Sequence, residues 1–224
     1  MKEINFIFIG LITVFCSCSD MFEKHQDFIK DGEIVYLSMI DSAGFNSGDE
    51  RGQLKLFYRS KSSLDRTIIY WNQRKDSLVL DISQIDPKVN TLSVLVDNLE
   101  EGSYEFEVIN KNSFEDKSLP YDVFGNVYGT EYQSGLTRRV IKGSKHLEGE
   151  TCIDWYTGSE KLIFTELLFL DKQSNKETII KVGTENQTII ESEIETFKYR
   201  SAYIPEVAAV DTFYSDWSDN ISIQ

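Results

Sequence analysis

The cysteine pair in FCSCSD offers the most specific chemistry in this sequence. The residue before a signal cleavage site must be small, and Cys18 is preceded by Ser17, whereas Cys16 is preceded by Phe15. We therefore predict that residues 1–17 are a cleaved signal peptide and that Cys18 becomes a diacylated N-terminus. Two or more acyl chains, each contributing about 0.8 kcal/mol per buried methylene, would attach the protein to a membrane through this lipid anchor.

Two alternatives to this lipid anchor remain open, a plain cleaved signal without a lipid and an uncleaved anchor helix. The apolar run of about a dozen residues is short for a hydrocarbon core, which needs roughly 20. Cys16 leaves with the signal, so the mature chain keeps only Cys18 and Cys152 of its 3 cysteines. No disulfide framework and no cysteine metal site are therefore expected, and Cys152 is interpreted as a small buried apolar residue.

Catalytic motifs are not found in the sequence. The 2 histidines are His25, in a predicted tether, and His146, in SKHLEGE, which we interpret as a solvated loop residue. Nothing marks a G-x-S-x-G nucleophile elbow, a Gly-rich phosphate loop or an H-E-x-x-H zinc motif. Paired carboxylates can hydrolyse glycosides, but two small sandwiches leave little room for a deep cleft. The sequence predicts no enzyme, no cofactor and no metal site.

One acidic stretch, residues 41–52 (DSAGFNSGDERG), contains oxygen ligands of the kind that Ca²⁺ prefers. Their spacing fits no EF-hand loop. We interpret the stretch as an ordinary acidic turn.

Aromatic residues outside clear strand alternation give the better indication of a binding role, because flat exposed rings offer apolar contact to the faces of sugars. Tyr128 and Tyr132 have an alternative role, which is to cement an interface between domains, and Trp71 and Trp155 are expected to fill two cores. The predicted ligand-binding residues are Tyr121, Phe124, Tyr128, Tyr132, Tyr214 and Trp217.

Period-two alternation dominates the chain from residue 33 onward and predicts strands with one buried face. Clusters such as NSGDERG and NQRKD separate the strands as turns. Three sets alternate most clearly, namely Leu54, Leu56 and Tyr58; Leu92, Val94 and Val96; and Tyr104, Phe106 and Val108.

The same pattern starts again after residue 135, which predicts two domains. Residues 18–30 are expected to be a lipidated tether, residues 31–134 one sandwich and residues 135–224 another. Strand candidates in the second half are residues 136–141, 151–156, 163–170, 177–182, 188–191, 197–204 and 211–217. The predicted fold is all-β, with two tandem antiparallel β-sandwiches.

The charge balance argues against a nucleic-acid partner. Lys and Arg number 23 and Asp and Glu number 37, a formal net charge of −14. A polyanion would be repelled by such a surface, and so would anionic lipid headgroups, so membrane attachment must come from the acyl chains.

Two resemblances extend these predictions. Residues 99–108 (LEEGSYEFEV) place a tyrosine after a Gly turn, at the head of an alternating strand, and so resemble the tyrosine corner of fibronectin type III and immunoglobulin-like sandwiches. The stretches FIKDGEIVY, YWN with DS, GSYEFEV, VYG, FKYRSAYIP and AVDTFY occur in an order similar to that of a Bacteroidota surface lipoprotein family, defined by an N-terminal domain of unknown function.

The resemblance to this family implies a cellular location and two alternative functions. Asp20 and Glu23 resemble the acidic signal that directs such lipoproteins to the outer face of the outer membrane. The architecture resembles accessory lipoproteins that accompany glycan importers. We therefore expect a non-enzymatic, surface-anchored module that binds an extracellular polysaccharide. The alternative is a structural or partner-docking subunit of an outer-membrane transporter complex.

Overall fold

The computed structural model describes residues 36–223 except 87, 173 and 174. The predicted signal peptide, the cysteine pair and the tether up to residue 30 lie outside the described residues.

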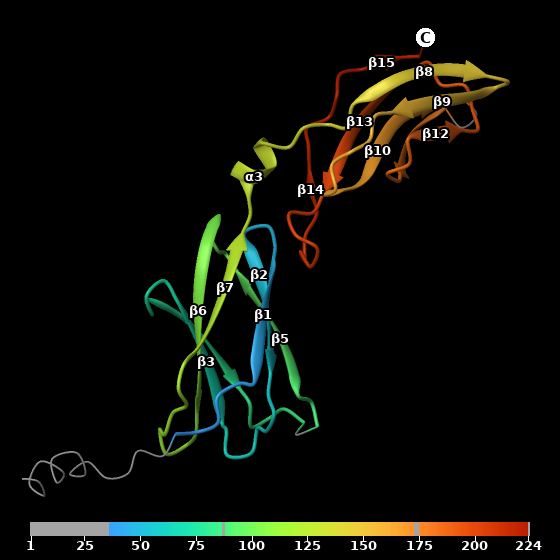
Figure 1. The fold of residues 1–224 in the computed structure, drawn as a ribbon. Helices are drawn as coiled ribbons and strands as arrows, with labels where there is room; N and C mark the ends of the chain where they lie inside the picture. Colours follow the sequence, from blue (N-terminus) through green and yellow to red (C-terminus); the bar gives the residue numbers. More distant parts are fainter. Residues whose placement is uncertain (1–35, 87, 173–174, 224) are drawn as a thin grey trace, which may run out of the picture. The chain divides into compact units, whose positions relative to one another are not determined.

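The first half of the described chain forms two antiparallel sheets (Figure 1). One sheet has the strand order β1-β2-β5 and the other has the order β4-β3-β6-β7. The strands are β1 (Ser42–Ser47), β2 (Arg51–Phe57), β3 (Arg66–Trp71), β4 (Asp76–Asp81), β5 (Thr91–Asp97), β6 (Gly102–Lys111) and β7 (Tyr121–Val127).

The second half repeats this plan after the short helix α3 (Thr130–Ser134). Its sheets have the orders β12-β9-β8 and β11-β10-β13-β14, and β15 also pairs with β13. The strands are β8 (Ile141–Leu147), β9 (Glu150–Trp155), β10 (Leu162–Asp171), β11 (Lys176–Val182), β12 (Gln187–Ile190), β13 (Thr196–Tyr203), β14 (Phe213–Tyr214) and β15 (Ile221–Ser222). The predicted fold class, two tandem antiparallel sandwiches, is confirmed, while the exact domain boundaries stay a prediction.

Alternating residues of both sheets fill the core of the first sandwich, as the sequence pattern predicts. Leu54 and Leu56 of β2 face Phe106 of β6, and all three side chains are fully buried. Trp71 packs against this core only in part, with its ring centroid 6.1 Å from that of Phe106.

Strand β1 corrects the expectation of an acidic turn over residues 41–52. Its sequence, SAGFNS, has weak strand propensity, yet all six residues pair with β2. The ring of Phe45 stacks on Phe106 at a centroid distance of 5.2 Å. It lies directly over two glycines, since a Cβ on Gly52 would come within 1.9 Å of that ring and one on Gly125 within 2.1 Å. A single large side chain and two bare backbone positions thus secure this strand.

The second core is built around Trp155, which is buried as predicted. Its ring packs against Tyr199 at 5.4 Å, and its indole N–H donates a hydrogen bond to Thr188. Arg139, only 3% exposed, lies with its guanidinium carbon 5.2 Å from the centre of the Trp155 ring. It donates hydrogen bonds to the carbonyl oxygens of Tyr156, Gly183, Thr184 and Glu185 at 2.8–3.2 Å.

The start of the second sandwich corrects the predicted strand over residues 136–141, because β8 begins only at Ile141. Before Ile141 the backbone is held by hydrogen bonds from side chains, in place of the backbone hydrogen bonds between paired strands. The Tyr203 hydroxyl donates to the Thr137 carbonyl and the Tyr199 hydroxyl to the Arg139 carbonyl. His146 consequently lies in β8, rather than in a loop, and is exposed.

Candidate functional site

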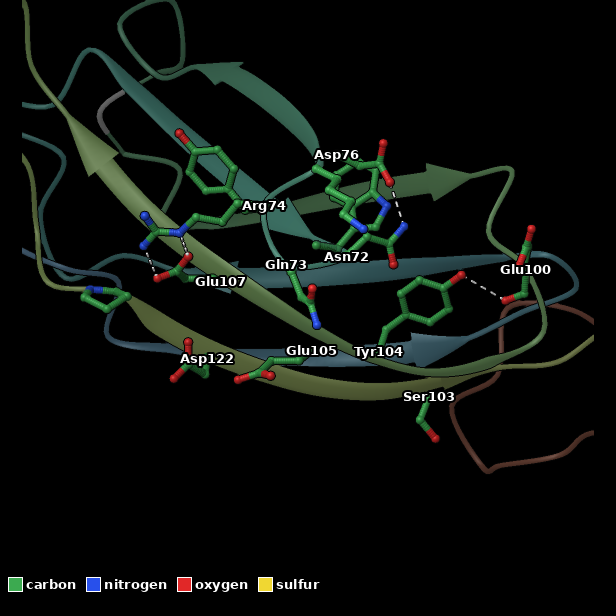
Figure 2. Close-up of a pocket in the computed structure, with 14 residues that line it drawn as sticks. Asn72, Gln73, Arg74, Asp76, Glu100, Ser103, Tyr104, Glu105, Glu107 and Asp122 are labelled. Carbon is green, nitrogen blue, oxygen red and sulfur yellow. Dashed lines mark hydrogen bonds and ion pairs between the residues drawn. The ribbon is translucent and has the colours of Figure 1, made fainter.

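An open hollow of about 970 Å³ lies on the sheet β4-β3-β6-β7 of the first sandwich (Figure 2). Its lining comes from β3, β6, β7 and the first residue of β4, from the β3–β4 turn, and from the segments just before β6 and β7. The volume is in the range of small-molecule sites. Ligand contact is therefore possible here without opening the core. The lining residues are Tyr70, Trp71, Asn72, Gln73, Arg74, Lys75, Asp76, Glu100, Ser103, Tyr104, Glu105, Glu107, Pro120 and Asp122.

The β3–β4 turn at the hollow has an unusual backbone. Asn72, Gln73 and Arg74 have consecutive positive φ angles of 50°, 57° and 62°. Non-glycine residues adopt this left-handed region at a cost, and such strain is concentrated at functional sites. The Asn72 side-chain amide donates to the Asp76 carboxylate at 2.6 Å, which closes the turn. The sequence identifies a turn at NQRKD, but nothing in it indicates three left-handed residues.

The strained turn directs Arg74 back over the sheet. Its guanidinium donates two hydrogen bonds to the Glu107 carboxylate, each at 2.5 Å, and its Cζ lies 5.5 Å from the centre of the Tyr70 ring. The hydrogen bond from Arg74 lowers the pKa of Glu107, while partial burial opposes the shift. Glu107 is therefore a fixed carboxylate at neutral pH, and Arg74 is not free to bind an anion.

Rigid aromatic surface forms another part of the hollow. The Tyr104 ring stacks on Phe106 at 5.7 Å, and its hydroxyl donates to the Glu100 carbonyl at 3.1 Å. That bond confirms the predicted tyrosine corner, and burial raises the pKa of the hydroxyl. Trp71 and Tyr70 line the hollow as well. Trp71 and Tyr104 are thus held by packing against the core, whereas the ring of Tyr70 lies beneath the guanidinium of Arg74.

The remaining lining is polar and mostly acidic. Gln73, Glu105 and Asp122 point to the same side of the sheet in Figure 2. Within the part of the chain that the structure describes, no ion pair joins Glu105 or Asp122 to a basic side chain. Carboxylate and amide oxygens accept hydrogen bonds from hydroxyl groups, but they repel anions. This chemistry suits a neutral, hydroxyl-rich ligand.

Of the six predicted ligand-binding aromatics, only Phe124 combines high exposure with a place beside the hollow. It is 70% exposed on β7 and is the cross-strand neighbour of Glu105. Tyr121, three residues earlier, lines the hydrophobic core instead. Neither residue lines the hollow itself.

Tyr128 and Tyr132 lie together on either side of the start of α3. Their ring centroids are 4.8 Å apart, and each ring also contacts Phe213 edge to face. The Tyr128 hydroxyl donates to the Glu206 carboxylate, and burial followed by this hydrogen bond raises its pKa to about 12. These contacts agree with the cementing role considered above as an alternative to ligand binding.

Tyr214 and Trp217 stack on one cation. The guanidinium of Arg200 lies 4.1 Å from the centre of the Tyr214 ring and 4.7 Å from that of Trp217. Arg200 also donates to the buried carboxylate of Glu166 at 2.7 Å. One face of each aromatic ring is therefore already covered by protein. The ligand contact expected of all six aromatics stays a prediction.

The hollow residues Tyr70, Trp71, Arg74 and Tyr104 were not predicted as a site. Alternation does indicate that Glu105 and Glu107 face outward, but it cannot show that Arg74 folds back onto them. The expectation that Trp71 fills the core is correct only in part, because its side chain also lines the hollow.

Other chemical candidates lie apart from the hollow. Cys152 is buried, as expected, and the ring of His146 shares a hydrogen bond with the Thr151 hydroxyl. No cluster of metal-ligating side chains occurs among residues 36–223 where these are described. The described helix is too short to cross a membrane.

The strand order defines a class, an all-β protein of tandem fibronectin type III-like sandwiches. The chain belongs to the DUF4998 family, described as a domain of unknown function, whose model matches residues 18–213. No curated protein matches the chain.

Two solved structures composed of fibronectin type III domains are similar to this chain. The FN1–FN3 domains of chicken CNTN1 share 13% identity at a TM-score of 0.45, and the match covers 86% of this chain and 66% of that one. A two-domain fibronectin type III segment of chicken tenascin shares 13% identity at a TM-score of 0.31, over 82% of this chain and 98% of that one.

Proposed function

We propose that this chain is a non-enzymatic lipoprotein, anchored through Cys18 at the outer face of the outer membrane, and that the hollow of its first sandwich binds an extracellular glycan. The observation that carries the proposal is the combination of rigid rings and hydrogen-bond acceptors in one open hollow. Sugars present apolar ring faces and hydroxyl donors together, so both parts of the hollow have a counterpart on the ligand.

The acidic lining narrows the class of glycan. Arg74 is paired with Glu107, and the other carboxylates of the hollow face solvent. Lys75 is the other basic residue of the lining, and the carboxylates of Asp76, Glu100, Glu105 and Asp122 outnumber it, so the net charge of the lining disfavours a sulfate or a uronate. We expect neutral polysaccharides to bind better than sulfated or uronic ones.

The test is a panel of neutral and anionic polysaccharides, screened by affinity electrophoresis and calorimetry with the mature protein. Tyr70→Ala and Gln73→Ala should each weaken retardation by a bound neutral polysaccharide. Leu95→Ala is the matched control, because Leu95 is an exposed side chain on the other sheet of the same sandwich. Absence of heat and of retardation across the whole panel would refute glycan binding.

The anchor has a separate test. Cys18→Ala should abolish acylation and release the protein from membranes, whereas Cys16→Ala should change neither. The reverse pattern would overturn the assignment of the cleavage site. A stoichiometric partner recovered from solubilised membranes, together with a negative glycan panel, would favour the docking role within a transporter complex instead.

A further inference from the structure

One end of the first sandwich gathers the connections that precede β1, join β2 to β3, join β4 to β5 and join β6 to β7 (Figure 1). Backbone hydrogen bonds tie them together, including Asp41 N–H to the Phe57 carbonyl and Asp65 N–H to the Lys111 carbonyl. We call this the entry end. It comprises the described residues of 37–41, 58–66, 81–90 and 111–120, with residue 87 excluded.

The entry end exposes apolar side chains on an ordered loop. Phe114 is 84% exposed and Leu119 is 51% exposed, both between β6 and β7. Buried Asn112 holds this loop, since its side-chain oxygen accepts the backbone N–H groups of Phe114 and Asp116, each at 3.0 Å. Phe114 is therefore presented to solvent by a fixed turn, and its burial against another surface would cost little ordering entropy.

The charge of the entry end differs from that of the chain as a whole. The sequence has a formal net charge of −14, yet this end is balanced. It carries the basic residues Arg59, Lys61, Arg66, Lys88, Lys111 and Lys117 and the acidic residues Asp41, Asp65, Asp81, Asp86, Glu115 and Asp116. An electrically neutral surface can approach a bilayer without the repulsion that the acidic remainder of the protein would meet.

The polypeptide also joins the sandwich here. The backbone N–H of Leu37 donates to the Lys117 carbonyl, and Leu37 bridges to Ser118. Residues 19–36 separate this point from Cys18. A lipid at Cys18 would hold the entry end at high effective concentration near the membrane, so weak contacts would suffice to dock it.

We propose that the entry end rests on the lipid bilayer, with Phe114 and Leu119 inserted among zwitterionic headgroups. The inference rests on the lipid anchor proposed at Cys18 and is independent of glycan binding. It adds a second membrane contact that orients the first sandwich. Aromatic side chains favour the interface between hydrocarbon and water, which is the depth that this loop would reach.

The test uses the full acylated protein in phosphatidylcholine vesicles. A nitroxide attached at Ser113→Cys should be reached by dissolved oxygen more readily than by a water-soluble nickel complex. Ser77→Cys is the matched control, because Ser77 is an exposed serine on β4 of the same sandwich, outside the entry end. Cys152 is buried, and unlabelled wild-type protein gives the background.

A second measurement does not depend on a label. Replacing Phe114 and Leu119 by Ser should speed transfer of the acylated protein between vesicles by roughly tenfold. Val207→Ser, at a 98% exposed position outside the entry end, should leave transfer unchanged. Acylated protein that floats with vesicles while both labels are equally water-exposed would overturn the docking. If wild-type protein isolated from cells carries no acyl chain on Cys18 and does not float with vesicles, the anchor is overturned, and the docking with it.

Discussion

Arg74 and Glu107 join the β3–β4 turn to the middle of β6 by two hydrogen bonds of 2.5 Å. The pair holds a strained turn against the sheet face. It also neutralises the positive charge of Arg74, which is therefore not available to a ligand. It therefore fixes both the shape and the acidic character of the hollow.

Glu107→Gln should lower the free energy of unfolding by about 0.5–1 kcal/mol at pH 7, because Arg74 remains largely exposed and solvent screens the pair. The folded pKa of Glu107 is depressed, so its contribution is present above the unfolded pKa of about 4.3 and is lost as the pH falls through the folded pKa. Urea unfolding of both proteins at pH 7 and pH 3 measures this. An equal difference at both pH values would contradict the assignment.

Arg139→Met should destabilise the second sandwich by about 2–4 kcal/mol, because it leaves buried carbonyl oxygens without donors. Arg138→Met is the control, since Arg138 is exposed and donates a hydrogen bond to the Trp217 carbonyl at the surface. Chemical denaturation followed by tryptophan fluorescence compares the two. Similar losses for both variants would argue against a special role for Arg139.

Gly125→Ala should cost about 1–3 kcal/mol, because the added methyl group overlaps the ring of Phe45. Gly44→Ala provides the contrast, as a Cβ there meets nothing within 4 Å. Thermal unfolding of the two variants should separate them clearly. A harmless Gly125→Ala would mean that Phe45 can move aside.

Phe124→Ala should leave the unfolding free energy within about 0.5 kcal/mol of wild type, because its side chain is largely exposed. If the hollow binds a glycan, the same change should reduce affinity, since a flat ring beside Glu105 is lost. Calorimetry with the bound polysaccharide measures this, with Ile179→Ala as a control at an exposed position of β11. Unchanged affinity would exclude Phe124 from the site.

Alternation in the sequence was sufficient to predict the fold class and much of both cores. Leu54, Phe106 and Trp155 are buried because moving apolar side chains out of water and into the space between two sheets is favourable in free energy. Strand β1 escaped prediction because Phe45 packs over Gly52 of the next strand and over Gly125, which is 80 residues away in the sequence. The hollow escaped it for a similar reason, since it depends on the backbone of residues 72–74, where the sequence offers no glycine.

Carbonyl dipoles, rather than a carboxylate, hold the buried guanidinium of Arg139. Added salt screens exposed charges over a Debye length of about 8 Å at physiological ionic strength but hardly affects a buried contact of this kind. The Arg74–Glu107 pair lies at the surface and has no such protection. Raising the ionic strength should therefore loosen the turn over the hollow while the second sandwich keeps its internal cation in place.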